Sequence, residues 1–469
     1  MSQRKVLLCT AVASFSVIWL APRAHGQVVS LLTQVNTDAT GKDIVGDAAN
    51  EPSIAVDPNN PNRMAIGWRQ FDTVTSNFRQ AGVAYSGDGG RTWTRSVLSP
   101  GQFGSDPVLA TDANGAFYYA SINNPNTFGV VVYKTVNGGA SWSSPVSAAG
   151  GDKEWITVDR TSGPGSGNVY VNWNESFATV PNTSFTRSTN GGASFNAPIA
   201  GPSPPSMWGT MDVGPNGTLY MAGSTQAQDG ILFTKSTNAQ FATQTPAFSQ
   251  PKLIPLGGNV FDGLAVNPEG LGGQIWIATD HSQSSGRGNI YVLGSVLPAT
   301  SNTLQVMFTK SANDGQTWSS PVRVNTDPIS DQAEHWFGTM SVAPNGRIDA
   351  IWNDTRNDPN HALSQLFYSY SLDFGNSWLG DIPISVPFDT RLGWPSQNKI
   401  GDYYDMVSDD LGVDLAFSAT FTGGQDVYFM RLTAVPEPHS LGMVVIGGCL
   451  LTGVLRRKRV APLTLAAKV

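Results

Sequence analysis

The chain has 469 residues, of which 40% are hydrophobic and only 13% charged, and its formal net charge is −7. Eight basic residues but a single acidic one lie outside residues 27–435, which leaves 20 basic and 34 acidic residues and a charge of about −14 between the two ends. This acidic balance argues against nucleic acid or anionic lipid as the main partner, because both require a basic surface.

The first 26 residues are typical of a secretory signal peptide. Arg4 and Lys5 precede an apolar run over residues 6–20, and the small residues Ala24 and Gly26 follow it. A basic start, a short apolar segment and a small-residue exit predict cleavage and export rather than a membrane span.

Five octapeptides share one pattern of Ser/Thr, Asp/Asn, Gly and a closing aromatic residue. They are Ser86-Gly-Asp-Gly-Gly-Arg-Thr-Trp93, Thr135-Val-Asn-Gly-Gly-Ala-Ser-Trp142, Ser188-Thr-Asn-Gly-Gly-Ala-Ser-Phe195, Ser311-Ala-Asn-Asp-Gly-Gln-Thr-Trp318 and Ser371-Leu-Asp-Phe-Gly-Asn-Ser-Trp378. A decayed sixth copy begins at Ser236. Asp or Asn caps backbone amides, Gly takes a positive φ and the aromatic residue packs beneath, so the pattern predicts structural turns between strands.

These octapeptides resemble the Asp-box, or BNR repeat, of sialidases and related secreted propellers. The resemblance implies an all-β propeller over residues 27–433, with blades of four strands. Turns within successive units are expected at Asp57, Asp112, Asp159, Gly214, Asn267, Ala343 and Asp409, which makes seven units. Such spacing is typical of a propeller, and the long fifth unit has room for an insertion around residues 283–300.

Seven blades depart from the six of the sialidase family, which remain the alternative. The seventh unit has only three strands of its own, ending near residues 427–432. Residues 31–38 read like residues 321–327, which form an outer strand after an octapeptide. We therefore expect the N-terminal strand to complete the last blade and to remove an exposed sheet edge.

Strand order predicts that the octapeptides lie on one face of the propeller and the ligand site on the other. On that other face, carboxylates and aromatic residues recur at the start of the inner strands and at the end of the second strands. Groups of these kinds that converge on one place suit carbohydrate binding. The candidate substrate-binding residues are Arg69, Trp155, Trp208, Asp262, His335, Trp336, Asp354, Arg356, Arg391 and Asp402.

The sialidase resemblance also implies a mechanism. In that family three arginines hold the substrate carboxylate, a Tyr–Glu pair supplies the nucleophile and an Asp is the acid/base. Here Tyr403 or Tyr404 would pair with Glu334, Glu51 or Asp106 would be the acid/base, and Arg69, Arg356 and Arg391 would form the clamp. The Arg-Ile-Pro segment of the family's first blade is replaced by Glu51-Pro-Ser-Ile, which puts sialidase activity in doubt.

Residues 434–469 resemble the PEP-CTERM sorting tail of Gram-negative bacteria. Val435-Pro-Glu-Pro438 precedes an apolar segment over residues 441–455, and Arg456-Arg-Lys-Arg459 closes it. The resemblance implies recognition by an exosortase and delivery to the cell envelope or extracellular matrix. A membrane segment with a basic cytoplasmic end would give almost the same location, whether the tail is cleaved or retained.

No cofactor is expected. Both cysteines, Cys9 and Cys449, lie in the end segments, and the histidines lack metal-ligand spacing. The many Asp and Asn residues leave an oxygen-ligand Ca²⁺ site as an alternative, although no EF-hand-like loop is present. The chain is thus predicted to be a sialidase-like, glycan-directed propeller of uncertain activity. The alternatives are a non-catalytic surface propeller that binds carbohydrate or protein, and a purely structural matrix protein.

Overall fold

The computed structural model describes residues 28–204, 206–329 and 332–434. The predicted signal peptide, sorting tail and membrane segment over residues 441–455 lie outside these residues. Among the residues described, no helix is both long and apolar enough to span a membrane.

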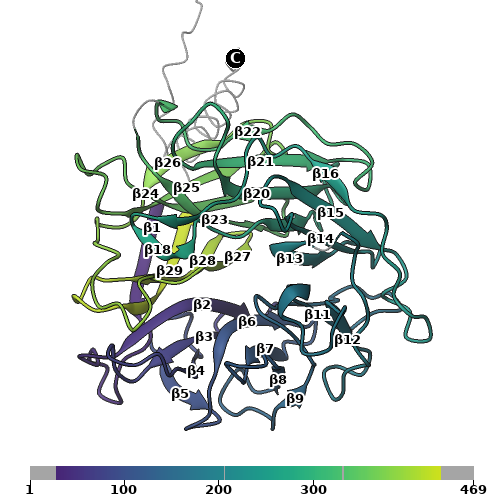
Figure 1. Cartoon of the computed structure of the whole chain (residues 1–469), viewed down its shortest axis with the longest axis horizontal. Coiled ribbons are helices and arrows are strands. Elements are labelled where there is room, and N and C mark those ends of the chain that lie inside the picture. Colours follow the sequence, from purple (N-terminus) through teal and green to yellow (C-terminus); the bar gives the residue numbers. More distant parts are fainter. Residues whose placement is uncertain (1–27, 205, 330–331, 435–469) are drawn as a thin grey trace, which may run out of the picture. The chain divides into compact units, whose positions relative to one another are not determined.

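The chain is all-β and forms seven blades around one axis, as predicted (Figure 1). Blades 1 to 3 consist, from the inner strand outward, of β2 (Ala48–Val56), β3 (Met64–Phe71), β4 (Gln80–Ser86) and β5 (Thr94–Leu98); β6 (Ser105–Thr111), β7 (Phe117–Ile122), β8 (Val130–Thr135) and β9 (Val146–Ser147); and β10 (Trp155–Val158), β11 (Val169–Asn172) and β12 (Phe185–Ser188). In blade 3 a single bridge between Phe185 and Ile199 occupies the place of a fourth strand.

The remaining four blades have four antiparallel strands each. They are β13 (Met207–Val213), β14 (Leu219–Ser224), β15 (Ile231–Ser236) and β16 (Lys252–Ile254); β19 (Trp276–Thr279), β20 (Ile290–Val296), β21 (Gln305–Ser311) and β22 (Val322–Arg323); β23 (His335–Val342), β24 (Ile348–Asp354), β25 (Gln365–Ser371) and β26 (Leu379–Pro383); and β27 (Asp405–Asp409), β28 (Gly412–Ala419), β29 (Asp426–Ala434) and β1 (Val28–Gln34).

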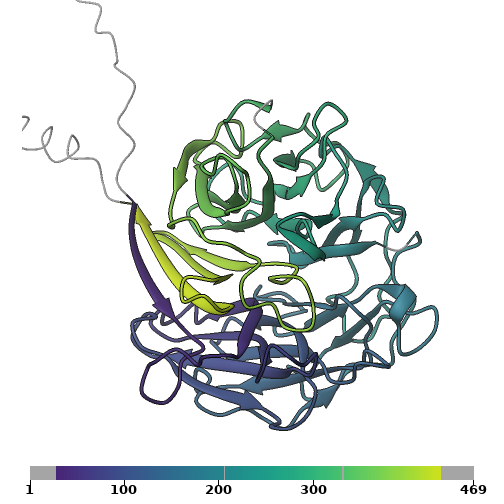
Figure 2. The same ribbon diagram turned by 60° about the vertical axis from the view of Figure 1, so that its left-hand side comes forward.

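The N-terminal strand closes the ring, as predicted. β1 pairs with β29 from Val28↔Ala434 to Gln34↔Tyr428, and Figure 2 shows the two strands side by side at the two ends of the colour scale. This pairing covers the edge of blade 7 that would otherwise remain open.

The fifth unit differs from its prediction. Its inner strand is β19, and the turn to the second strand spans residues 280–289, where the Gly288 N–H donates to the Asp280 carbonyl at 2.8 Å. Asn267 instead belongs to an additional hairpin of β17 (Asp262–Leu264) and β18 (Asn267–Leu271). The insertion therefore precedes the inner strand, and residues 290–296, which we expected inside the insertion, form the second strand of the blade.

The five octapeptides form the predicted turns. In each, the first hydroxyl accepts from the glycine N–H four positions later, as from Gly375 to Ser371 at 2.8 Å, and the Asp/Asn caps a later amide, as Asp373 accepts from Ser377 at 2.9 Å. Gly375 has φ +75°, and a Cβ there would lie 2.1 Å from the Phe308 ring of the preceding blade, so both conformation and space require glycine. We call this side of the propeller the box face and the opposite side the mouth.

A cation at the end of a third strand joins several blades to the next. Lys134, Lys235 and Lys310 donate to the carbonyls of Gly191, Asp314 and Phe374, at 2.9, 2.9 and 2.8 Å. Each acceptor is the fourth residue of the octapeptide in the following blade, and Arg187 donates to Ala239, at the same position of the decayed copy. The repeat thus carries its own inter-blade contact.

Lys310→Met is expected to lower the free energy of unfolding by about 1 kcal/mol, because the hydrogen bonds of its ammonium group to the Phe374 carbonyl and the Asn376 side chain of blade 6 are lost at a half-exposed site. Lys252→Met, at an exposed position of β16, is the control and should change it by less than about 0.5 kcal/mol. Denaturant titration measures both, and equal effects would contradict a role for the contact.

Candidate functional site

The inner strands begin at the mouth with a strained residue. In blades 1, 2, 4 and 6 the ladder between the first two strands shifts its register near the mouth, and Glu51, Asp106, Trp208 and Phe337 have φ between +51° and +58° there. Lys153, just before β10, has φ +57°. Left-handed backbone is unfavourable for such residues, and bulges of this kind re-aim side chains next to functional sites.

Six charged side chains from blades 1, 2, 3 and 7 meet near the axis of the mouth. We call Glu51, Arg69, Asp106, Lys153, Lys399 and Asp402 the charge layer. Glu51 lies 3.1 Å from the Arg69 Nε and 3.2 Å from the Lys399 Nζ. Asp402 accepts from Lys399 at 2.7 Å and also from Lys153, which lies 3.3 Å from Asp106. The candidate residues Glu51, Asp106 and Asp402 thus converge with lysines from neighbouring entry segments.

The pKa values of carboxyl groups in and beside the charge layer are shifted in opposite directions. Burial alone would raise the pKa of Asp402, but Lys153 and Lys399 outweigh it and keep that pKa well below its usual range. Burial raises the pKa of Glu51 to about 7 against the opposing charges of Arg69 and Lys399. Burial also raises the pKa of nearby Glu154 well above its usual range, and its carboxyl oxygens have no hydrogen-bond partner among the residues described.

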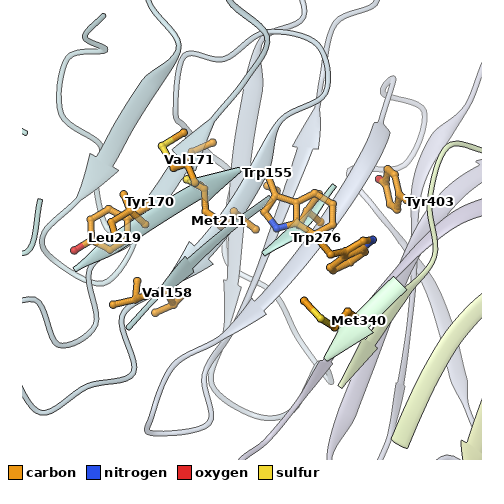
Figure 3. Packing of buried hydrophobic residues seen from close by; sticks show 14 of the residues in the cluster. Trp155, Val158, Tyr170, Val171, Met211, Leu219, Trp276, Met340 and Tyr403 are labelled. Carbon is orange, nitrogen blue, oxygen red and sulfur yellow. The ribbon is translucent and has the colours of Figure 1, made fainter. Parts of the chain in front are cut away.

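Aromatic residues close the axis next to this layer. The Trp155 ring lies 5.2 Å from Trp276 and 5.7 Å from Tyr403, so blades 3, 5 and 7 touch across the centre (Figure 3). We call these three residues the aromatic plug. Tyr403 is buried and donates its hydroxyl hydrogen to the Pro107 carbonyl at 2.9 Å. Trp155 and Tyr403 are therefore packing residues here, whereas the sequence suggested a binding platform and a nucleophile.

A cavity of about 650 Å³ lies beside the charge layer on the mouth. Trp208, Phe177 and Met207 provide its apolar surface. Its polar surface comes from the following residues: Asp152, Lys153, Asn174, Ser176, Gln226, Gln228, Asp262, Glu269, Lys399 and Asp402. The structure thus brings the predicted Trp208, Asp262 and Asp402 to one hollow, which we call the mouth cavity.

The additional hairpin β17–β18 forms the wall of the mouth cavity. Asn267 accepts from the Ile400 N–H at 2.9 Å and donates to the Gly401 carbonyl at 2.9 Å. The Leu271 N–H donates to Asp402 at 3.0 Å. The inserted segment of blade 5 is therefore fastened to the entry segment of blade 7 and helps to hold Asp402 in place.

A second buried cluster surrounds His335 in blade 6. His335 places one ring nitrogen 2.8 Å from the Leu304 carbonyl and the other 3.0 Å from the Asp327 carboxylate. Asp354 lies 3.5 Å away, and Arg356 pairs with Asp354, Asp327 and Asp381. Both ring nitrogens face acceptors, so both carry hydrogen and the imidazole is positively charged. These predicted residues form a structural ion cluster among themselves.

Stability is expected to fall with rising pH through His335. Burial alone would lower its pKa, but Asp327 and Asp354 outweigh it and raise the pKa. A raised histidine pKa contributes stability that is complete below about pH 6.5 and is lost as pH rises through the folded value. Asp327→Asn should move this loss to lower pH in denaturation and histidine NMR titrations. A His335 that titrates at or below its ordinary pKa would contradict the assignment.

The remaining candidates lie elsewhere. Trp336 and Tyr404 are buried in the core of blades 6 and 7, and the Tyr404 hydroxyl donates to Ser418 at 2.6 Å. Glu334 accepts from the Leu304 N–H at 2.9 Å, and in the described part of the chain the hydroxyls of Tyr403 and Tyr404 donate to other partners, the carbonyls of Pro107 and Ser418. Arg391 is 44% exposed and pairs with Asp389 at 2.7 Å. The three candidate arginines thus belong to separate networks, each already facing carboxylates.

Sequence reasoning missed Lys153 and Lys399, which neutralise the layer. Each is close in sequence to a candidate residue: Lys153 precedes Trp155 by two positions, and Lys399 precedes Asp402 by three. A lysine next to the carboxylates that precede an inner strand was the sequence signal that could have indicated these two residues. Their meeting depends on contacts across the axis between blades distant in the chain.

Comparison with known proteins supports the architecture. Neither a protein-family model nor a curated protein sequence matches the chain. A fungal alcohol oxidase of the AA5 family, solved with copper, has a TM-score of 0.53 at 10% identity, over 88% of this chain and 77% of its own. A Dyadobacter fermentans protein has a TM-score of 0.49 at 14% identity over 87% of this chain and 99% of its own. Trypanosoma rangeli sialidase with the inhibitor DANA has a TM-score of 0.41 at 13% identity, over 93% of this chain and 64% of its own.

The arrangement of its sheets makes the chain a β-propeller protein. The likeness to the alcohol oxidase reaches no further than the fold, because the identity is only 10%. Within that class it is a seven-bladed propeller with a charge layer and an aromatic plug on its axis.

Proposed function

We propose that the protein is a glycan-binding propeller and that the mouth cavity is its binding site. The observation that carries this proposal is the lining of the cavity, which combines the Trp208 and Phe177 rings with amides and carboxylates. Sugar rings offer both an apolar face and hydroxyl groups, so they suit an aromatic surface flanked by fixed donors and acceptors.

The arginine arrangement weighs against exo-sialidase chemistry. A substrate carboxylate requires free, converging guanidinium groups. Arg69, Arg356 and Arg391 instead face Glu51, a group of three aspartates and Asp389, respectively. A fluorogenic sialoside should therefore not be hydrolysed by the purified protein, and turnover that the double variant Tyr403→Phe/Tyr404→Phe abolishes would overturn this view.

Glycan binding is tested on an array of neutral and acidic oligosaccharides, followed by calorimetry with those that bind. Trp208→Ala is expected to weaken binding by at least about tenfold, because the aromatic surface is lost. Leu372→Ala, exposed on the box face, is the control and should leave binding unchanged. An array without any bound glycan, or equal binding by the Trp208 variant, would refute the proposal.

Glycoside hydrolysis is a second candidate, favoured by one observation. Burial raises the pKa of Asp152 at the edge of the mouth cavity, while nearby Asp402 remains ionised. Glycosidases require one protonated and one ionised carboxyl group. If the protein hydrolyses a bound glycan, Asp152→Asn should abolish turnover and retain binding; binding without turnover by the unchanged protein leaves the non-catalytic function.

We further propose that the protein is exported and sorted to the envelope through its C-terminal segment. β1 and β29 pair at Val28 and Ala434, where the other third strands end in the turns of the box face. Attachment through the segment after Ala434 would direct the mouth away from the membrane. On intact cells, Asn126→Cys at the mouth should then react faster with an impermeant maleimide than Leu372→Cys; the reverse order would contradict this orientation.

A further inference from the structure

The mouth cavity continues outward into a second hollow. This hollow has a volume of about 410 Å³ and is lined by Glu175, Ser176, Ala178, Pro181, Asn182 and Gln226. Ser176 and Gln226 line both hollows, so the two are adjacent at the loops of blades 3 and 4, and we call this place the neck. Together they form one groove that leads from the charge layer toward the rim.

Hydrogen bonds between side chains hold the neck in place. Asn174 caps the short 3₁₀ helix η1 (Glu175–Phe177) by accepting from the Ser176 N–H at 3.1 Å. The Gln226 amide donates to Asn174 at 3.3 Å, and the Ser176 hydroxyl lies 3.4 Å from Gln226. Gln226 is itself exposed, so a ligand that passes the neck contacts it directly.

The groove is closed at its inner end. Lys153, Lys399 and Asp402 line this end and are only 11%, 9% and 1% exposed. The hairpin β17–β18 is fastened beside them by its contacts to Gly401 and Asp402. Across the axis the rings of the aromatic plug pack against one another and join blades 3, 5 and 7. A polymer that enters from the rim therefore stops at the charge layer.

We propose that this groove binds the end of a linear, uncharged polysaccharide, with the terminal sugar against Asp402 and the following sugars running outward past Gln226. The proposal rests on the glycan-binding function above and specifies its ligand. An internal segment of a polymer needs two open ends, whereas a chain terminus needs one, and the nearly buried Lys153, Lys399 and Asp402 at the inner end suit a terminus.

The charges in the groove select against acidic sugars. Both lysines at the closed end are already paired, Lys153 with Asp106 and Asp402, and Lys399 with Glu51 and Asp402. The acidic residues Glu175, Asp262 and Glu269 also line the two hollows, together with Asp152, whose pKa is raised by burial. A carboxylate on the ligand would therefore meet a negative wall without a free cation, whereas hydroxyl groups find acceptors.

The test measures binding of the full chain to cello-, malto-, xylo-, manno- and arabino-oligosaccharides of increasing length. Each oligosaccharide is offered in three forms: free, coupled to a carrier through its reducing end, or doubly blocked, that is, coupled in this way and capped by a bulky acetal at the other end. Oligogalacturonides serve as acidic probes. We expect affinity for one neutral series to rise over the first few sugars and then level off, and the doubly blocked form to bind at least about tenfold more weakly.

Variants at the neck complete the test. Gln226→Trp should reduce the affinity for long oligomers to that for the shortest bound one, because the outer hollow is cut off. Asn126→Trp, on the corresponding exposed loop of blade 2, should change nothing. Equal binding of doubly blocked and free oligomers, or a preference for oligogalacturonides, would overturn this inference but leave glycan binding intact. Failure of every series to bind would refute the proposed function itself.

Discussion

Replacing Asp402 by asparagine is expected to lower the free energy of unfolding by about 3 kcal/mol. Its carboxylate accepts from both Lys153 and Lys399 and also from the Leu271 N–H. An amide has a single acceptor oxygen, so its NH₂ group would face either the Leu271 N–H or the two ammonium groups, which are almost wholly out of water. The estimate lies at the lower end for a broken buried pair because both lysines border the mouth cavity and can be partly hydrated.

The comparison is Asp389→Asn, which breaks the exposed pair with Arg391 and should cost less than about 1 kcal/mol. Adding Lys399→Met to Asp402→Asn should restore part of the loss, because one unpaired ammonium group is removed. Chemical denaturation measures all three. A cost for Asp402→Asn no larger than that for Asp389→Asn would show that the charge layer does not stabilise the ring.

Trp155→Ala is expected to cost about 4 kcal/mol of unfolding free energy. Trp155 is buried between Trp276 and Tyr403, and these contacts join blades 3, 5 and 7 across the axis. No neighbouring side chain can fill the space of an indole ring, so a cavity would remain. Thermal and denaturant unfolding measure the loss, and Trp155→Phe should recover much of it.

Glycan affinity separates Trp155 from Trp208. The folded Trp155→Phe variant should bind glycan as the unchanged protein does, because Trp155 does not line the mouth cavity, whereas Trp208 does. Trp208→Ala should show the opposite pattern, with weakened binding and a smaller loss of stability. If Trp155→Phe lost binding while it remained stable, the plug would belong to the ligand site.

The sequence predicted the architecture because each blade repeats a local pattern. The octapeptide of Ser371 combines a hydroxyl, a capping carboxylate and a glycine within a few residues, and each part acts on the backbone beside it. The closing strand was also predictable, since residues 31–38 resemble an outer strand of another unit. The fifth unit was misread because the alternation around Asn267 describes a real hairpin, but one outside the blade.

For the candidate site, the sequence predicted the face of the propeller on which it lies and some of its residues. Glu51, Asp106, Trp208, Asp262 and Asp402 occupy the mouth as expected, since strand direction alone decides the face. Which of them meet depends on contacts across the axis, such as Lys153 with Asp402, which are 249 residues apart.

The sequence by itself therefore determined the repeat, the ring closure and the face of the site, because these follow from local hydrogen bonding and strand alternation. Only the tertiary structure decided that Tyr403 packs in the plug, that the arginines lie apart and that the lysines neutralise the layer, because side chains from distant blades compete for one narrow axis.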